Sequence, residues 1–396
     1  MNNLNSTISA NRLHIGFFGC RNAGKSSIVN ALTGQTLSVV SDTKGTTTDP
    51  VFKAMELLPL GPVMIIDTAG IDDEGNLGEL RVSKTREVLR KTDIAVLVVD
   101  AKIGLQSADR DLIAEFKERN TPYIICFNKA DTLKELPTAQ KGEIYVSAKS
   151  GEGIEDLKQA IADIIPQGEE RHIVWDLIEK RDTVLLVIPI DSAAPKGRII
   201  LPQQLVLRDT LDKGGIAICC QPSELTATLS NLKTPPKLVI TDSQAFGMVK
   251  DMVDERINLT SFSILMARHK GTLKSAVDSA ETIKKLRDGD RVLIAEGCTH
   301  HRQCEDIGTV KIPMWLKSYT GKDLELDITS GREFPEDLSP YKLVIHCGGC
   351  TLNEKEMAYR VKTAKENNVP FCNYGIFIAA VNGIIERSTR FLPEYK

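Results

Sequence analysis

The sequence predicts an α/β protein in which a domain with a parallel sheet is followed by two further, smaller α/β domains. Short apolar runs alternate with amphipathic segments, which is the pattern of parallel strands joined by crossover helices. The chain has 396 residues, of which 42% are hydrophobic, and this is too long for one ordinary core. A polar linker is expected at Pro166–Arg171. We therefore expect domains at residues 1–168, 169–270 and 271–396.

Each domain has its own series of strand and helix signals. Strands of the first domain are expected at Leu13–Phe18, Val63–Asp67, Ile94–Asp100, Tyr123–Asn128 and Glu143–Ser147. Strands of the second are expected at Thr183–Pro189, Gly215–Cys220, Lys237–Thr241 and Ile257–Ser261. The third is expected to contain a helical stretch at Ser275–Leu286, strands at Arg291–Glu296 and Lys342–His346, and helices at Glu354–Asn367 and Ile376–Ile385.

Composition narrows the classes of function. The 50 basic and 53 acidic residues nearly cancel, and no basic stripe is interleaved with aromatic residues, so no nucleic acid partner is expected. Every apolar run is far shorter than the roughly 20 residues of a membrane span. Met1–Arg12 lacks the apolar run of a secretory signal, so we expect a cytoplasmic protein with no membrane partner. Its nine cysteines would then stay reduced, and clustered ones would bind metal.

A complete phosphate-loop pattern follows the first strand and opens a predicted helix, as the binding mechanism requires. Gly19 and Gly24 allow backbone N–H groups to surround an anion. Lys25 can reach the β- and γ-phosphates, and Ser26 can bind Mg²⁺. The residues of this loop expected to contact the nucleotide are Gly19, Asn22, Ala23, Gly24, Lys25, Ser26 and Ser27.

Two further segments are expected to sense the γ-phosphate. Asp67 begins the sequence Asp-Thr-Ala-Gly at a strand end, so its carboxylate can hold the water shell of Mg²⁺ and the N–H of Gly70 can meet the γ-phosphate. The polar segment Gly45–Asp49 contains Thr47, the threonine expected to join the Mg²⁺ ligands. The expected catalytic residues are Lys25, Thr47, Asp67 and Gly70.

The choice of base is predicted by two more strand-end motifs. The Asp131 carboxylate can accept hydrogen bonds from N1–H and N2–H₂ of guanine, whereas adenine presents an acceptor at N1. Lys129 can lie over the ring, and the Ala148 N–H can meet O6. The expected base contacts are Asn128, Lys129, Asp131, Ser147, Ala148 and Lys149. The sequence therefore predicts a P-loop GTPase domain that binds GTP and GDP and hydrolyses GTP.

Residues 10–165 resemble the translation-factor class of GTPases, in the branch of the tRNA-modifying MnmE and ribosome-assembly Era proteins. In members of that branch that K⁺ activates, the asparagine matched by Asn22 is a potassium ligand, so the resemblance implies K⁺ beside the phosphates. The alternative is that Asn22 only tolerates an unusual turn. Ile71 stands where Ras-like proteins carry a water-orienting glutamine, so intrinsic turnover should be slow.

Two groups of cysteines follow predicted strands of the third domain. Loops at the carboxyl ends of neighbouring parallel strands converge, so Cys298 can approach Cys347 and Cys350. Three thiolates and a weaker fourth ligand suit a [4Fe–4S] cluster, and three cysteines with one histidine suit zinc equally well. Candidates for the fourth ligand are Glu305, His300, His346 and Cys304. Cys126, Cys219 and Cys220 lie inside predicted strands and are expected to be core residues.

Over essentially its full length the chain resembles the [FeFe]-hydrogenase maturation GTPases of the HydF family. The resemblance is carried by the phosphate-loop GTPase motifs, a middle α/β segment, and Cys298-Thr-His300 followed by His346-Cys347-Gly-Gly-Cys350. It implies a [4Fe–4S] cluster held by Cys298, Cys347 and Cys350, with Glu305 as a displaceable fourth ligand and His300 or His346 as alternatives.

The same resemblance implies a function in metal-cluster assembly. It implies a homodimer formed through residues 169–270 and a scaffold that receives a diiron subcluster from radical-SAM maturases. The apo [FeFe]-hydrogenase would be the recipient.

Two other functions compete with this one. The first is a potassium-dependent GTPase of tRNA modification or ribosome assembly with a zinc-stabilised C-terminal domain. The second is a GTP-dependent interaction module in which the three cysteines are merely buried. Analysis of iron and sulfide separates them.

Overall fold

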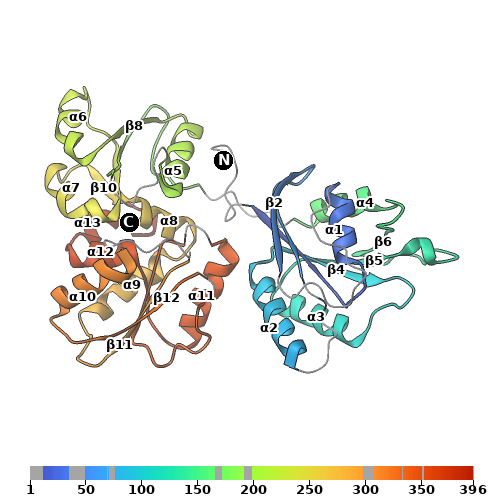
Figure 1. The fold of residues 1–396 in the computed structure, drawn as a ribbon. Coiled ribbons are helices and arrows are strands. Elements are labelled where there is room, and N and C mark those ends of the chain that lie inside the picture. The colour runs from blue at the N-terminus through green and yellow to red at the C-terminus, as the bar shows by residue number, and fades with distance from the viewer. Residues whose placement is uncertain are drawn as a thin grey trace. The chain divides into compact units, whose positions relative to one another are not determined.

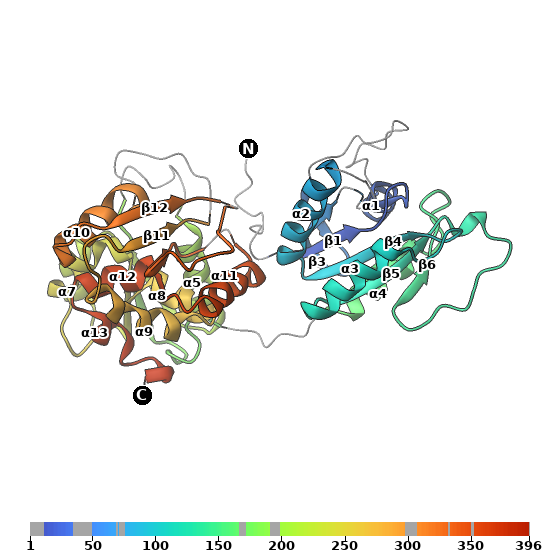
Figure 2. The same ribbon diagram turned by 90° about the horizontal axis from the view of Figure 1, so that it is seen from below.

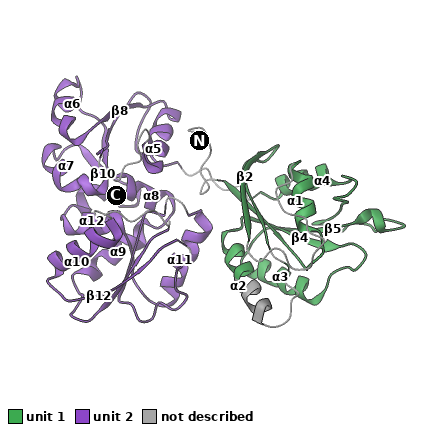
Figure 3. Ribbon diagram, in the orientation of Figure 1, with its two compact units in different colours: residues 1–168 green, residues 169–396 purple. Residues whose placement is uncertain are grey.

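The computed structural model describes residues 12–34, 50–68, 70, 76–165, 172–190, 199–297, 307–331, 333–349 and 352–395, with the backbone alone at 76–83. The chain divides into two compact units, residues 1–168 and 169–396 (Figure 3). The expected division of 169–396 at about residue 270 stays a prediction. Among the described residues, the helices are too short or too polar to cross a bilayer.

The first unit is a six-stranded sheet with the order β2-β3-β1-β4-β5-β6 (Figure 1). Its strands are β1 (Leu13–Phe18), β2 (Val51–Leu57), β3 (Gly61–Asp67), β4 (Ile94–Asp100), β5 (Tyr123–Asn128) and β6 (Glu143–Tyr145). Its helices are α1 (Lys25–Thr33), α2 (Asn76–Lys91), α3 (Ser107–Glu118) and α4 (Ile154–Asp163). This arrangement confirms the predicted α/β fold of a P-loop GTPase.

Helices cover both faces of this sheet, which is why its central strands are apolar throughout. On β4, Ile94, Val96 and Val98 pack in one core together with residues of α1 and α4. The intervening Ala95, Leu97 and Val99 pack in a second core with residues of α2 and α3. Alternate residues of one strand thus contribute to opposite cores.

Strand β2 was not predicted, and it is antiparallel to β3, whereas the other pairs of this sheet are parallel. It is an edge strand whose side chains are mostly exposed. Lys53 and Glu56 interrupt its apolar residues, so it lacks the continuous apolar run that reveals a buried strand. The predicted parallel sheet therefore carries one additional antiparallel strand at this edge.

The second unit contains two parallel four-stranded sheets, with the orders β10-β9-β7-β8 and β12-β11-β13-β14. The neighbouring strands β11 and β12 are labelled in Figure 2. The first sheet consists of β7 (Thr183–Val187), β8 (Ile216–Cys220), β9 (Leu238–Thr241) and β10 (Asn258–Ser261). The second consists of β11 (Arg291–Ala295), β12 (Glu325–Thr329), β13 (Leu343–His346) and β14 (Phe371–Asn373). The helices are α5 (Leu201–Asp212), α6 (Leu225–Asn231), α7 (Phe246–Met252), α8 (Phe262–His269), α9 (Leu273–Ile283), α10 (Ile312–Thr320), α11 (Glu354–Glu366), α12 (Tyr374–Val381) and α13 (Ile385–Thr389).

One hydrophobic core runs through both sheets of this unit. It includes Leu186 of the first sheet, Ile294 of the second, and Leu265 and Phe377 of helices α8 and α12. Helix α12 is almost entirely apolar, as expected for a helix buried on all sides. A smaller core on the other face of the second sheet joins it to α11.

Two expectations for this unit need correction. Strands β12 and β14 were not predicted as strands, because β12 is a half-exposed edge and β14 has only three residues. Cys219, expected in the core, is exposed, because β8 is the edge strand of its sheet. Cys126 is fully buried on β5, as expected, and burial raises the pKa of its thiol.

Candidate functional site

The phosphate loop leaves β1 and enters α1 in a conformation that only glycine tolerates at two positions. Gly19 has φ of +135°, and a Cβ there would lie 2.1 Å from the carbonyl oxygen of Val98. Gly24 has φ of +93°, and its Cβ would lie 2.2 Å from Nδ2 of Asn128. Lys25 is buried and donates to the carbonyls of Gly19 and Cys20, both at 2.9 Å. The lysine therefore lies against the loop that it is expected to serve.

Ser26 and Asp67 form the part of the site suited to a hard cation. The Ser26 hydroxyl donates to Oδ2 of Asp67 at 2.6 Å. Within the described residues, Oδ1 of Asp67 is buried without a hydrogen-bond partner. A buried carboxylate oxygen in this state suits a cation or its bound water. Thr47 lies outside the described residues. A Cβ on Gly70 would lie 2.8 Å from the Cα of Arg21, so the chain at Gly70 passes close to the phosphate loop.

The residues expected to recognise the base form a connected group. Ser147 donates to Oδ1 of Asp131 at 2.7 Å, which fixes the orientation of that carboxylate. Asn128 donates to the carbonyl of Ala23 at 2.9 Å and accepts from the N–H of Ala148 at 3.1 Å. The Ala148 N–H, expected to meet the guanine O6, therefore contacts Asn128 in this structure, and the two base motifs are bound to the phosphate loop and to each other.

Lys129 connects the base motif to the phosphate loop. Its ammonium group donates to the carbonyl of Asn22 and to Oδ2 of Asp100, both at 2.7 Å. Burial alone would raise the pKa of Asp100, but the hydrogen bond and charge of Lys129 lower it overall. Asn22 is exposed and has φ of 60°, a left-handed conformation that asparagine tolerates. Lys149 is exposed.

The cysteine site lies where β11 and β13 end side by side. The sulfur of Cys347 accepts hydrogen bonds from the backbone N–H of Gly297 at 3.0 Å and of Gly349 at 3.4 Å. A Cβ on Gly297 would lie 2.8 Å from Leu352, so the two strand-end segments are in contact. The expected convergence of the two segments is thus present at Gly297, the residue before Cys298. Cys298, His300, Cys304, Glu305 and Cys350 lie outside the described residues.

His346 is already engaged and is a poor candidate for a metal ligand. Its Nδ1–H donates to the carbonyl of Cys347 at 2.7 Å, because a carbonyl can only accept. Nε2 therefore accepts from Arg360 at 3.0 Å. Burial, and next the charge of Arg360, lower the pKa of His346 to about 3. Both ring nitrogens are therefore occupied in this structure, which makes His346 the weaker of the two histidine alternatives for the fourth ligand.

Arg360 completes a buried polar network beneath the cysteine loop. It is 1% exposed, pairs with Glu356 at 3.0 Å and donates to the carbonyl of Gly331 at 2.8 Å. The spacing of Glu356 and Arg360 on one helix was visible in the sequence as an i,i+4 pair. Their contact with His346 was not visible, because it depends on the tertiary fold.

Lys270 is a further residue at the loop that the sequence did not suggest. At the end of α8, its ammonium group donates to the carbonyl of Gly349 and, at 3.3 Å, to that of Leu352. These partners are 79 and 82 positions away in the sequence, so no local sequence pattern predicts the contact. Among the residues that the structure describes, no three or more His, Cys, Asp or Glu side chains gather as metal ligands.

The strand-end loops of the first unit define the protein as a P-loop GTPase. Residues 14–129 match the family model of the 50S ribosome-binding GTPase. Residues 173–271 match the hydrogen maturase F dimerization domain, and residues 274–391 match the hydrogen maturase F tetramerization domain. The last two matches together cover more than half of the chain, so it belongs to the hydrogen maturase F (HydF) family. The resemblance to that family is confirmed.

Curated relatives are similar over smaller shares of their length. A tRNA modification GTPase MnmE of Thiobacillus denitrificans is 34% identical over 147 residues, 37% of this chain and 32% of that protein. The GTPase Der of Rhizobium leguminosarum bv. trifolii is 27% identical over 316 residues, 75% of this chain and 64% of that protein. The chain thus spans about a third of the length of the first of these relatives.

A solved structure, that of Era from Aquifex aeolicus bound to GDP and AlF₄⁻, is 18% identical to this chain. It has a TM-score of 0.35, and the likeness covers 52% of this chain and 92% of that one.

Proposed function

We propose that this protein is a GTPase and a [4Fe–4S] scaffold that assembles the diiron subcluster of [FeFe]-hydrogenase and transfers it to the apo-enzyme. The observation that carries the proposal is the sulfur of Cys347, which accepts two backbone N–H groups at the junction of β11 and β13. Hydrogen bonds to sulfur stabilise a thiolate and tune an iron–sulfur cluster. A cysteine that only filled a core would not need them.

The proposed cluster ligands are Cys298, Cys347 and Cys350, with Glu305 in the fourth position and His300 as the alternative. When bound, the cluster supplies an iron corner without a thiolate, at which a diiron unit can dock. Gly297 and Gly349 direct their N–H groups at the Cys347 sulfur, and His346 holds the Cys347 carbonyl. Radical-SAM maturases would deliver the cargo, and apo-hydrogenase would receive it.

The proposal is tested on full-length protein purified without oxygen, by measuring iron, sulfide and zinc. We expect about four irons and four sulfides per chain and an electron paramagnetic resonance signal after reduction. Cys347→Ser should lose most of the iron, whereas Cys219→Ser, an exposed cysteine away from the loop, should keep it. Stoichiometric zinc without sulfide would instead favour a GTPase of tRNA modification or ribosome assembly with a zinc-stabilised C-terminal domain. The relative MnmE is named as a tRNA modification GTPase.

In the first unit, Ser26, Asp67 and Thr47 are the proposed Mg²⁺ partners. The 2.6 Å bond between Ser26 and Asp67 and the unpartnered oxygen of Asp67, among the described residues, support this. Lys25 and the N–H of Gly70 would stabilise charge on the γ-phosphate during hydrolysis. Asn22 is the proposed K⁺ ligand, since it is exposed at the phosphate loop, and turnover is expected to be slow.

A homodimer is the proposed assembly, and β8 is its proposed contact. This strand is the edge of its sheet, and its apolar Ile216 is 49% exposed. An exposed apolar edge strand can pair with the same strand of a second copy. The match of residues 173–271 to a dimerization domain supports the assignment.

A further inference from the structure

We infer that Lys270 is a positioning residue for the cluster-binding loop, an inference that rests on the proposed function. Gly349 is held from two directions. Its N–H donates to the sulfur of Cys347 at 3.4 Å, and its carbonyl accepts from the ammonium group of Lys270. The same ammonium group donates to the carbonyl of Leu352 at 3.3 Å. Lys270 thus binds the loop on both sides of Cys350.

The conformation of Gly349 explains why the hydrogen bond from Lys270 can restrain the loop. Gly349 has φ of +57°, and a Cβ there would lie 2.5 Å from the sulfur of Met357. Glycine is flexible, so packing alone fixes its peptide groups weakly. The hydrogen bond from Lys270 is charge-assisted and therefore stronger than a neutral one. It restrains the carbonyl, and with it the direction of the N–H that contacts the Cys347 sulfur.

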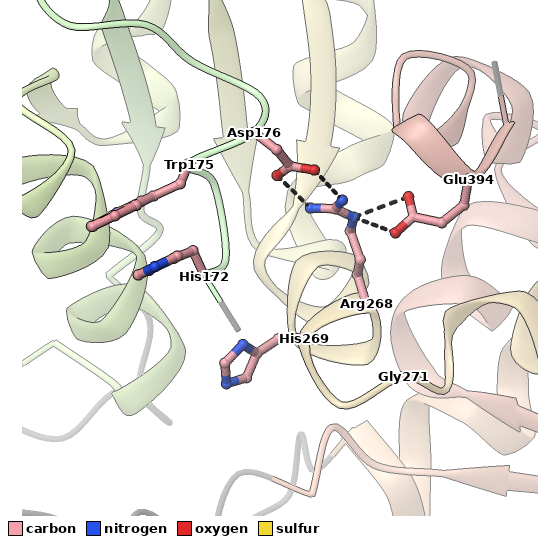
Figure 4. A pocket seen from close by; sticks show the side chains of 7 residues that line it. All are labelled: His172, Trp175, Asp176, Arg268, His269, Gly271 and Glu394. Carbon is pink, nitrogen blue, oxygen red and sulfur yellow. Dashed lines mark hydrogen bonds and ion pairs between the residues drawn. The ribbon is translucent and has the colours of Figure 1, made fainter. Parts of the chain in front are cut away.

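Lys270 is itself placed by a fixed helix end. Its N–H caps α8 by donating to the carbonyl of Met266 at 3.0 Å. Two positions earlier, Arg268 lies between the carboxylates of Asp176 and Glu394 beside a pocket of about 400 Å³ (Figure 4). Its guanidinium donates to Oδ1 of Asp176 at 2.9 Å and to Oε1 of Glu394 at 2.8 Å. Arg268 is only 12% exposed in its side chain, so the end of α8 is held where Lys270 begins.

The contact also joins two parts of the second unit. Lys270 belongs to the residues that match the dimerization domain, and the loop belongs to those that match the tetramerization domain. The positive charge of Lys270 lies beside a loop expected to hold several negative thiolates. Loss of this charge should make the reduced cluster harder to form, because reduction adds negative charge.

The test compares Lys270→Met, Lys270→Arg and the control Lys274→Met in the full-length protein, reconstituted without oxygen. Lys274 is exposed on α9 and carries the same charge change without touching the loop. We expect Lys270→Met to release iron to a chelator about tenfold faster than wild type, because loss of a residue that supports a metal ligand typically weakens metal binding by about tenfold or more. Its midpoint potential should also become more negative. The iron-release rate and the midpoint potential of Lys270→Arg should lie between those of Lys270→Met and wild type. Those of Lys274→Met should match wild type.

Several outcomes decide the matter. Iron release and potential unchanged in Lys270→Met would overturn the inference while leaving the proposed function intact. Equal changes in Lys274→Met would also overturn it, because a general charge effect would then suffice. If Lys270→Met is too unstable to purify, Lys270→Arg must show the intermediate change. Wild-type protein that binds no iron would defeat the proposed function itself.

Discussion

Ser147 holds one oxygen of Asp131 at 2.7 Å, so the carboxylate is oriented before any nucleotide arrives. Orientation in advance reduces the entropy lost on binding. A carboxylate accepts two hydrogen bonds from guanine, whereas an amide offers one acceptor and one donor group. We therefore expect the preference for guanine to depend on the Asp131 side chain.

Replacing Asp131 by asparagine should weaken binding of guanine nucleotides by about tenfold or more, because one charge-assisted hydrogen bond is lost and a repulsive donor–donor contact replaces it. Titration with a fluorescent GDP analogue measures the loss. Ser147→Ala should have a smaller effect, since it removes only the orienting hydroxyl. Equal affinity of the wild-type protein for ATP and GTP would contradict the base assignment.

The potassium hypothesis concerns Asn22 alone. If its side chain is a K⁺ ligand, GTP hydrolysis should be faster in K⁺ than in Na⁺ at equal ionic strength. Asn22→Gly is the suitable variant, because glycine accepts the φ of 60° and the loop keeps its path. The variant should lose the K⁺ advantage and still bind GDP. Wild-type rates that do not differ between the salts would remove the hypothesis.

At the scale of elements, burial decides which parts of the fold the sequence reveals. Strands β1, β4 and β5 match their predicted bounds, because each is apolar and almost wholly buried. The edge strands β2 and β12 were missed, because their side chains are mostly exposed or half-buried and no continuous apolar run marks them. Strand β8 shows the opposite case, because its continuous apolar run suggested burial and Cys219 was assigned to the core, although β8 is an edge strand.

The sites follow a similar rule. The phosphate loop and the cysteine groups could be predicted from the sequence, because each is a set of residue types at a fixed spacing directly after a strand. Gly297 donates its backbone N–H to the Cys347 sulfur across 50 positions, and Lys270 donates to the backbone carbonyl of Gly349 across 79. Contacts that use backbone atoms leave no residue pattern. The sequence did not show that His346 is engaged, because its partner Arg360 lies 14 positions away on the next helix and their contact depends on the tertiary fold.

The exposed edge of β8 makes a prediction about assembly. Ile216→Lys places a charge on that edge and should shift the protein towards monomers. Leu136→Lys, at a residue of the first unit that is 57% exposed, is the matched control and should remain dimeric. Sedimentation velocity over a range of concentrations measures both. A wild-type protein that stays monomeric at every concentration would contradict the assembly.

At the scale of the whole molecule, each proposed site is built within one compact unit. Ser26, Asp67 and Asp131 belong to residues 1–168, whereas Cys347 and Lys270 belong to residues 169–396. No side chain described here serves both sites. A variant that loses GTP hydrolysis should therefore still bind iron, and a variant that loses iron should still hydrolyse GTP.

Lys25→Ala should reduce GTP hydrolysis strongly, because the lysine neutralises phosphate charge, and should leave iron and sulfide content unchanged. The reciprocal variant, Cys347→Ser, should lose iron and retain GTP hydrolysis. A malachite green assay for phosphate and a colorimetric iron assay on the same preparations measure both. A loss of iron in Lys25→Ala would show that cluster assembly needs the nucleotide site.

The core shared by both sheets of residues 169–396 also bears on how this protein changed over time. Leu265 and Phe377 pack among apolar residues of both sheets, so each sheet depends on the other for one of its apolar faces, although the second sheet also has a smaller core against α11. A gene fusion that exchanged one of them for a foreign counterpart would leave mismatched apolar surfaces. The two segments are therefore expected to be inherited together, each substitution in one constrained by side chains of the other.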